Sequence, residues 1–204
     1  DPEVLMEGIK FLQAHQKELQ NAFSEQQFKK QKTQLFNNPS DPVFNSDGDV
    51  TVVEFFDYRC GYCKKNAADI RKLLENHDNV RLIYKEVAIL GPASVELHKF
   101  SLAVSRLAPE KYPAFHHGLI SSENTTIDTA KRLAGSLGID VEDVLQRATG
   151  GDIQKQLDES SQLMRELGIR GTPAFYVGDE LLAGLRGYQE LRAKVLQQSA
   201  EKSE

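Results

Sequence analysis

The sequence predicts an α/β fold in which a helical subdomain is inserted between two β-containing halves, with a helical extension before the first half. Two observations carry this prediction. Apolar segments rich in β-branched and aromatic residues occur in two separate regions of the chain, and a long region of helical periodicity lies between them. The predicted strands are 50–56 and 80–87 before the helical region, and 174–177 and 181–183 after it.

The composition limits the possible classes of function. The chain has 204 residues, of which 40% are hydrophobic, so one domain with room for an insertion is expected. No apolar run approaches the roughly 20 residues that a membrane-spanning helix needs. The net charge of -5 argues against a nucleic-acid partner, because phosphate-binding proteins concentrate Lys and Arg on one face.

An amphipathic helix is predicted for residues 1–36. Leu5, Leu12 and Leu19 recur every seven residues and give the helix an apolar stripe that needs a partner. The stripe either folds back onto its own domain or pairs with copies of itself. We expect the second arrangement, as a homodimer or homotrimer formed through residues 1–36.

Capping patterns set the expected bounds of this helix. Asp1 suits an N-cap and Pro2 suits the first helical position. Ser24-Glu25-Gln26-Gln27 fits a capping box, which predicts that the helix breaks there and restarts. The restarted segment would face inward with three apolar residues, Phe28, Leu35 and Phe36.

The first β-containing half follows a linker at 37–49 that contains prolines and turn residues. Within the linker, 42–44 could form a short edge strand. The strand at 50–56 leads into a helix that ends near Asn76. The strand at 80–87 is expected to run parallel to it, because a helix crosses between the two strands.

The rest of the chain is predicted to be helical up to the second β-containing half. A hairpin is expected around Gly178-Asp179, then a closing helix at 188–198 and a frayed tail at 200–204. The helices of the insertion are predicted at 92–107, 109–120, 127–137, 141–148 and 153–167. We therefore divide the chain into an oligomerisation extension, a first half, an inserted helical subdomain and a second half, at 1–38, 39–90, 91–168 and 169–204.

Cys60 and Cys63 are the only cysteines, and they lie where the strand at 50–56 passes into a helix. The ring that they would close spans only four residues, so as a structural disulfide it would stabilise little. A zinc site usually needs two more Cys or His ligands, and no matching histidine pair is present. A catalytic dithiol is therefore expected, with no metal and no cofactor other than the redox-active disulfide.

The helix start favours a thiolate at Cys60, because the helix dipole and the backbone amides stabilise negative charge there. Cys60 is thus the expected attacking sulfur, and Cys63 is placed to resolve a mixed disulfide. Glu54 lies in an otherwise apolar strand. Burial would raise its pKa and make it a proton shuttle for Cys63, whereas strand alternation could instead point it to water.

The segments Glu54-Phe55-Phe56-Asp57-Tyr58-Arg59-Cys60-Gly61-Tyr62-Cys63 and Gly171-Thr172-Pro173-Ala174-Phe175 resemble a thioredoxin-fold protein of the DsbA type. The resemblance covers about residues 42–199, including the helical insertion. It implies that Pro173 is cis and faces the active-site disulfide, and that Glu54 is a buried proton-transfer group. It also implies that nearby backbone pairs with substrate as an added strand.

Two dipeptides depart from the best-known monomeric oxidase of that family. Gly61-Tyr62 stands between the cysteines in place of Pro-His, so the strongly oxidising potential cannot be carried over. Thr172 precedes the proline, as in the isomerase relatives. With the N-terminal extension, these features resemble the subgroup that includes suppressor-of-copper-sensitivity protein C and Com1-type proteins. The expected substrate-binding residues are Gly61, Tyr62, Gly171 and Thr172.

The resemblance implies a thiol-disulfide oxidoreductase that acts on unfolded or misoxidised secreted proteins, as a disulfide isomerase, an oxidase or both. A membrane redox partner and a periplasmic location are expected, with no nucleic-acid partner. The start at Asp1 without Met is compatible with a removed signal peptide or with a chain shortened for expression. The alternatives are a Cu(I)-binding or copper-resistance protein that uses the same two thiols, and a purely structural role in the envelope.

Overall fold

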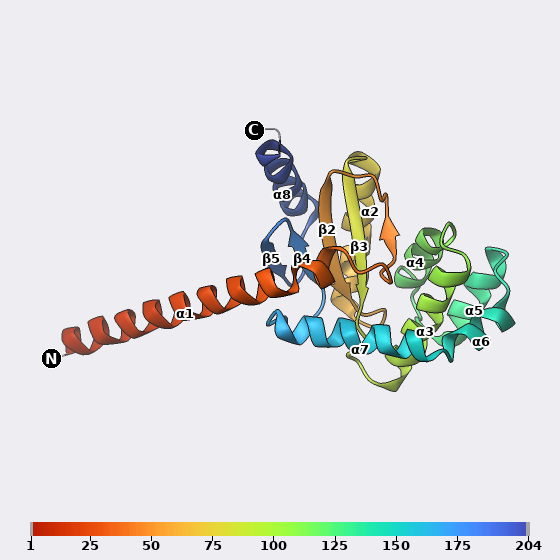
Figure 1. Ribbon diagram of the computed structural model, residues 1–204, viewed down its shortest axis with the longest axis horizontal. Helices are drawn as coiled ribbons and strands as arrows, with labels where there is room; N and C mark the ends of the chain where they lie inside the picture. The colour runs from red at the N-terminus through yellow and green to blue at the C-terminus, as the bar shows by residue number, and fades with distance from the viewer. Residues whose placement is uncertain (1, 203–204) are drawn as a thin grey trace.

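The computed structural model describes residues 2–202, which contain a five-stranded sheet of order β1-β3-β2-β4-β5 (Figure 1). The parallel pair is β2 and β3, and the other neighbours are antiparallel. This arrangement confirms the predicted α/β fold with its helical insertion and N-terminal extension. The strands are β1 (Val43–Phe44), β2 (Val50–Phe56), β3 (Val80–Glu86), β4 (Ala174–Val177) and β5 (Glu180–Ala183).

The helices α1 (Pro2–Phe36) and α2 (Gly61–Asn76) belong to the extension and the first half of the sheet. The later helices are α3 (Pro92–Leu107), α4 (Tyr112–Ile120), α5 (Ile127–Ser136), α6 (Val141–Ala148), α7 (Gly151–Glu166) and α8 (Tyr188–Glu201). Most predicted bounds agree with these. The predicted tail at 200–204 is wrong for residues 200 and 201, because the side-chain amides of Gln197 and Gln198 donate to Glu201 and extend α8; residues 203 and 204 lie outside the described part.

Side-chain alternation along β2 separates two layers of the core. Val52 and Phe56 face the layer that contains α2, α8 and most of the insertion helices. Val53 and Phe55 face the opposite layer, which contains α7 and the end of α1. Both faces of the central strand are therefore covered, which explains its nearly continuous apolar sequence.

Most of α1 projects from the body as a straight stem (Figure 1). The predicted break at Ser24 is wrong, since one helix runs from Pro2 to Phe36. Residues 9–36 contain neither Gly nor Pro, and the Lys29 ammonium lies 2.7 Å from the Glu25 carboxylate one turn away. The capping pattern at Ser24 therefore does not end the helix, because no Gly or Pro interrupts it there. The proposed cap Asp1 lies outside the described residues.

A buried ion pair fixes the root of the stem to the sheet. The Lys85 ammonium, on β3, binds the carboxylate of Asp41 and the carbonyl oxygen of Gln34, and the side chains of the two charged residues are only 1% exposed. Leu35 is fully buried beside them. The linker predicted at 37–49 is therefore attached to the sheet through its polar residues.

One glycine of the linker is required by close packing. A Cβ atom on Gly48 would lie 2.5 Å from the backbone nitrogen of Arg81, so no other residue fits without moving β3. Within residues 2–202, no helix combines the length and apolar character needed to cross a membrane.

Candidate active site

Cys60 is the N-cap residue of α2, and Cys63 lies in the first turn of that helix. Both are free thiols. Their exposures differ, because 8% of Cys60 is accessible to solvent but only 1% of Cys63. Both cysteines are buried, but Cys60 keeps more solvent access than Cys63, the asymmetry that a nucleophile and a resolving thiol require.

The segment 171–173 meets the cysteines from far along the chain. The Thr172–Pro173 peptide bond is cis, as the family resemblance implies. The Cys60 thiol donates a hydrogen bond to the Thr172 carbonyl oxygen at 3.3 Å. Pro173 is buried and Thr172 is half-buried, whereas Gly171 is exposed. The structure therefore brings Cys60 together with the loop that the sequence placed beside it.

Glu54 lies on the sheet face that contains both thiols. Its cross-strand partners, Tyr84 on β3 and Phe175 on β4, belong to the same core layer as Cys60 and Cys63. Only 4% of Glu54 is exposed, so the alternative orientation towards water is wrong. Burial raises the pKa of this carboxyl to about 8, and it is therefore mostly protonated at neutral pH.

The environment of Cys63 disfavours its thiolate. Burial, and next the charge of an ionised Glu54, raise the pKa of the Cys63 thiol well above its usual value. A leaving or attacking Cys63 sulfur therefore needs a proton donor or acceptor within the protein. Glu54 is the carboxyl that acts on this thiol.

The dipeptide between the cysteines is exposed. Tyr62 has 61% of its surface accessible, and the Lys65 ammonium lies 5.5 Å from the centre of its ring. Gly61 has no atom near the position that a Cβ would take. Gly61 and Tyr62 thus form a surface beside Cys60 that a substrate chain could contact.

Asp57 holds the loop that precedes Cys60. Its Oδ1 accepts hydrogen bonds from the Arg59 amide and the Ser94 hydroxyl, both at 2.8 Å. Its Oδ2 accepts from the amides of Ile89 and Leu90 at 2.9 and 3.1 Å. One buried carboxylate therefore fastens the active-site loop to the segment between β3 and α3.

His98 lies between two buried carboxylates. Its Nδ1 donates to Glu86 Oε2 at 2.7 Å, and its Nε2 lies 3.7 Å from Asp57 Oδ1. Nε2 accepts the Tyr58 amide at 3.3 Å when it is unprotonated, so the two contacts of Nε2 belong to different protonation states. Burial lowers the pKa of His98, but the hydrogen bonds and charges of Asp57 and Glu86 outweigh it and raise the pKa to about 9.

This buried polar network was not among the functional residues expected from the sequence. The signal was present in part, since Asp57 interrupts an aromatic run and Glu86 ends an apolar strand. His98 gave no such signal, because it stands among apolar residues on a helix and its partners come from β3 and the active-site loop. Glu86 also accepts hydrogen bonds from two hydroxyl groups, those of Ser101 and Tyr112.

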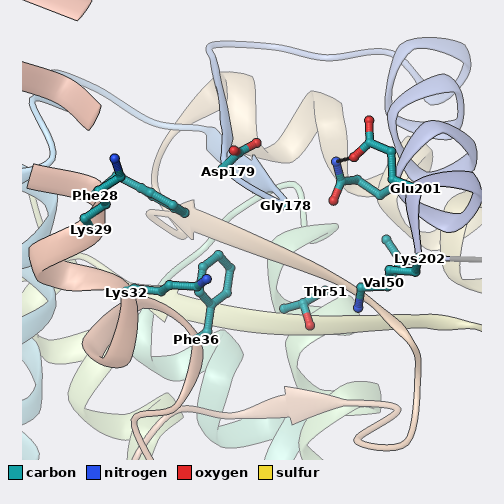
Figure 2. A pocket seen from close by; sticks show the side chains of 11 residues that line it. Phe28, Lys29, Lys32, Phe36, Val50, Thr51, Gly178, Asp179, Glu201 and Lys202 are labelled. Carbon is teal, nitrogen blue, oxygen red and sulfur yellow. Dashed lines mark hydrogen bonds between the residues drawn. The ribbon is translucent and has the colours of Figure 1, made fainter. Parts of the chain in front are cut away.

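A pocket of about 500 Å³ lies at the other end of β2 (Figure 2). Phe28, Lys32 and Phe36 of α1 line one side of it, and Gly178 and the end of α8 line the other. Val50 begins β2 at this pocket, whereas Cys60 follows the end of β2, so the pocket is remote from the thiols. Among residues 2–202, no group of three or more His, Cys, Asp or Glu side chains is arranged to hold a metal ion.

Comparison with known proteins agrees with this geometry. The sequence profile of the DSBA-like thioredoxin domain family matches residues 51–195. Disulfide bond formation protein D of Bacillus subtilis (strain 168) is 26% identical over 166 residues, which cover 76% of this chain and 75% of that protein.

Two solved structures extend the comparison. The thiol-disulfide exchange protein alpha-DsbA2 from Wolbachia pipientis is 31% identical with a TM-score of 0.81, over 88% of this chain and 97% of that chain. A linker-deletion mutant of Proteus mirabilis ScsC is 26% identical with a TM-score of 0.83, over 98% of this chain and 94% of that chain. The second similarity covers nearly the whole chain.

The raised pKa of Glu54 predicts a pH-dependent cost of stability. A buried acid of raised pKa contributes stability that is fully present below its unfolded value of 4.5 and is lost as pH rises through about 8. Under reducing conditions, the free energy of unfolding of Glu54→Gln minus that of wild type should therefore rise by roughly 3 to 5 kcal/mol when the pH is raised from 4 to 9. Urea unfolding measures this, with the exposed Glu110→Gln as the control. A constant difference across that pH range would contradict the prediction.

His98 gives a second pH effect. Its folded pKa of about 9 exceeds the ordinary 6.5. Its contribution to the free energy of unfolding is therefore complete below pH 6.5 and is lost as pH rises through 9. In a Glu54→Gln background, His98→Gln should destabilise the protein by roughly 2 to 4 kcal/mol more at pH 6 than at pH 10. The exposed His15→Gln is the matched control. An equal loss at both pH values would show that His98 acts only through packing.

Proposed function

Because the chain belongs to the family of DSBA-like thioredoxin domains, we propose that it exchanges disulfides with secreted proteins that are unfolded or misoxidised, as an isomerase, an oxidase or both. One observation carries the proposal. Cys60 is the N-cap residue of α2 and its thiol donates to the Thr172 carbonyl oxygen before the cis Pro173, while Cys63 is more deeply buried and the charge of Glu54 raises its pKa. Such an arrangement separates an attacking sulfur from a resolving one.

In the oxidase direction, a client thiolate attacks Cys60 of the Cys60–Cys63 disulfide. A client–Cys60 bond forms, the Cys60–Cys63 bond breaks, and the departing Cys63 sulfur takes a proton that protonated Glu54 supplies. A second client thiolate then attacks the client sulfur, a disulfide forms within the client, and Cys60 leaves as a thiolate. Two electrons pass from the client to the two cysteines.

In the isomerase direction, the reduced protein begins the exchange. The Cys60 thiolate attacks a wrong client disulfide and forms a mixed disulfide, and the released client thiolate is free to attack another disulfide. The final client thiolate displaces Cys60, so no net electrons are transferred. If the client stalls, Cys63 gives its proton to ionised Glu54 and displaces the client in reduced form.

Backbone near Thr172 and Pro173 is proposed to pair with the client, with Gly61, Tyr62 and Gly171 completing the binding surface. Cys60, Cys63 and Glu54 carry the chemistry. The contact of the Cys60 thiol with the Thr172 carbonyl oxygen supports this proposal, because it brings the attacking sulfur next to that backbone. Clients are recognised mainly through their backbone, which suits a protein that meets many unfolded sequences.

The stem α1 supports the isomerase assignment. Its residues Leu5, Ile9, Leu12, Leu19 and Phe23 recur at intervals of three, four or seven residues and are 43% to 67% exposed. This spacing is that of a coiled-coil seam. We therefore propose a homodimer or homotrimer through residues 1–36, in which several Cys60 sites share one client.

The proposed location is the periplasm, because protein disulfides form and persist in oxidising compartments. A membrane redox partner would restore the oxidised or reduced state of the two cysteines after each cycle. Within residues 2–202, a Cu(I) site would have the two thiols as its soft ligands, with no cluster of further His, Cys, Asp or Glu around them. The copper alternative stays an untested prediction.

Substitution of the cysteines separates the two sulfur roles. Cys60→Ala should abolish both insulin reduction and the refolding of a scrambled disulfide protein. In the Cys63→Ala variant, Cys60 should still attack client disulfides. Because the resolving thiol is missing, a mixed disulfide between Cys60 and the client should accumulate. Mass spectrometry detects this species, and a reductant should remove it. Activity that survives Cys60→Ala would remove the proposed function and leave the copper and structural alternatives.

A shortened chain tests the stem. A chain that begins at Ser24 keeps Leu35 and the contacts of Lys85, so its catalytic body should fold and remain monomeric, whereas the full chain should form a dimer or trimer. Size-exclusion chromatography with light scattering measures both masses. In the full chain, glutamate in place of Leu5, Leu12 and Leu19 should give the same monomer. A monomeric full chain would sink the proposed assembly.

A further inference from the structure

Two adjoining surface pockets form a trough along the end of α7. The first is lined by Ile89, Ser161, Met164, Arg165, Gly168, Ile169 and Arg170. The second is lined by Gln16, Phe23 and Ser24 of α1 together with Leu167, Gly168, Arg170 and Leu181. Gly168 and Arg170 line both, so the two pockets adjoin at these residues. Figure 1 shows the end of α7 beside the stem, where this trough lies.

One end of the trough lies beside the active site. Ile89 donates its amide to Asp57, the residue that fastens the loop before Cys60. Arg170 is two residues before Thr172, whose carbonyl oxygen contacts the Cys60 thiol. Two residues of this end of the trough, Ile89 and Arg170, are thus close in the chain or by hydrogen bond to groups that hold Cys60, and an extended client segment of about eight residues is about 26 Å long.

The lining combines apolar groups with cations. Met164 and Ile169 belong to the buried core, and Ile89 and Phe23 are 41% and 56% exposed. Arg165 and Arg170 are exposed, and no ion pair or hydrogen bond is recorded for either guanidinium within residues 2–202. No carboxylate lies among the described residues that line the trough. In a chain of net charge -5, this is a local excess of positive charge.

More positive charge stands near Cys60. Arg59 immediately precedes the cysteine, is exposed, and donates to the Leu90 carbonyl oxygen at 3.4 Å. Burial, and next the charge of Arg59, lower the pKa of the Lys64 ammonium. Arg59 therefore stands next to the first pocket through its hydrogen bond to the neighbour of Ile89, whereas the Lys64 ammonium donates to the Ser122 and Glu123 carbonyl oxygens on the insertion side.

We propose that this trough selects client segments in which apolar residues and carboxylates lie beside the reacting cysteine. Arg165 and Arg170 bind the carboxylates, and the apolar lining receives the alternate side chains of an extended chain. The proposal rests on the proposed thiol-disulfide exchange and adds a substrate class to it. Basic client segments are disfavoured, because like charges meet at the trough.

Selection of clients by charge acts mainly on the rate at which a client associates with the protein. Complementary charges raise association rates at low ionic strength, and salt removes the effect because the Debye length falls to about 10 Å at 0.1 M. The apolar contacts persist in salt. Selectivity between acidic and basic clients should therefore decline with ionic strength, while the reaction itself continues.

The test uses three dithiol peptides and the full chain with Cys60–Cys63 oxidised beforehand. Each peptide carries a tail of about eight residues, in which leucine alternates with glutamate, glutamine or lysine, and versions with the tail before and after the cysteines are compared. Stopped-flow measurement gives kcat/KM for peptide oxidation. We expect the glutamate peptide to exceed the lysine peptide by about tenfold at low salt and by about twofold in 0.5 M salt.

Variants locate the effect. The double substitution R165Q/R170Q should reduce the tenfold preference to about twofold, whereas R192Q, an exposed arginine of α8 outside the trough, should leave it unchanged. Equal rates for the three peptides in wild type would overturn the inference and leave the proposed function standing. A preference that survives R165Q/R170Q would also overturn it. Failure to oxidise any of the peptides would instead count against the proposed function.

Discussion

The burial of one carboxyl group beneath one thiol is the constraint on which the site depends. Glu54 can stay in the apolar β2 only as a protonated acid or at a cost in stability, and Cys63 can leave a disulfide only if a proton reaches it. The charge of an ionised Glu54 is one of the causes that raise the pKa of Cys63. The sheet keeps Glu54 on the same face as α2, and the covering helices exclude water, so fold and chemistry are inseparable here.

Much of this arrangement was predictable from local sequence. The strand that ends before Cys60 and the helix that starts there follow from short-range patterns. Those patterns left open whether Glu54 points into the core or to water. The hairpin at Gly178 was predicted for the same reason, because Gly178-Asp179 is a turn pair between two short apolar segments. The position of Thr172-Pro173 beside Cys60 came from family resemblance, because no local pattern joins Cys60 to Thr172, which is 112 positions away.

The sequence did not predict the features that are formed by residues far apart in the chain. His98 has an ordinary helical context, and its unusual charge state depends on a strand end and a loop that pack against it. The trough likewise combines side chains from α1, α7, β5 and two loops. The wrong prediction for α1 has a different cause. The residues from Ser24 to Gln27 fit a capping box, but the helix continues through them. Tertiary packing and uninterrupted helical propensity decided these outcomes.

The ion pair between Asp41 and Lys85 has a consequence for how the chain can change over time. Loss of either partner leaves an uncompensated charge in the core, so the two positions tolerate replacement only together, by a matched apolar pair. Because Asp41 lies in a segment of loop-like composition, the pair also restricts insertions and deletions there, since a change in length would move the carboxylate away from β3. A segment that appears free to drift in sequence is therefore held to a nearly constant length.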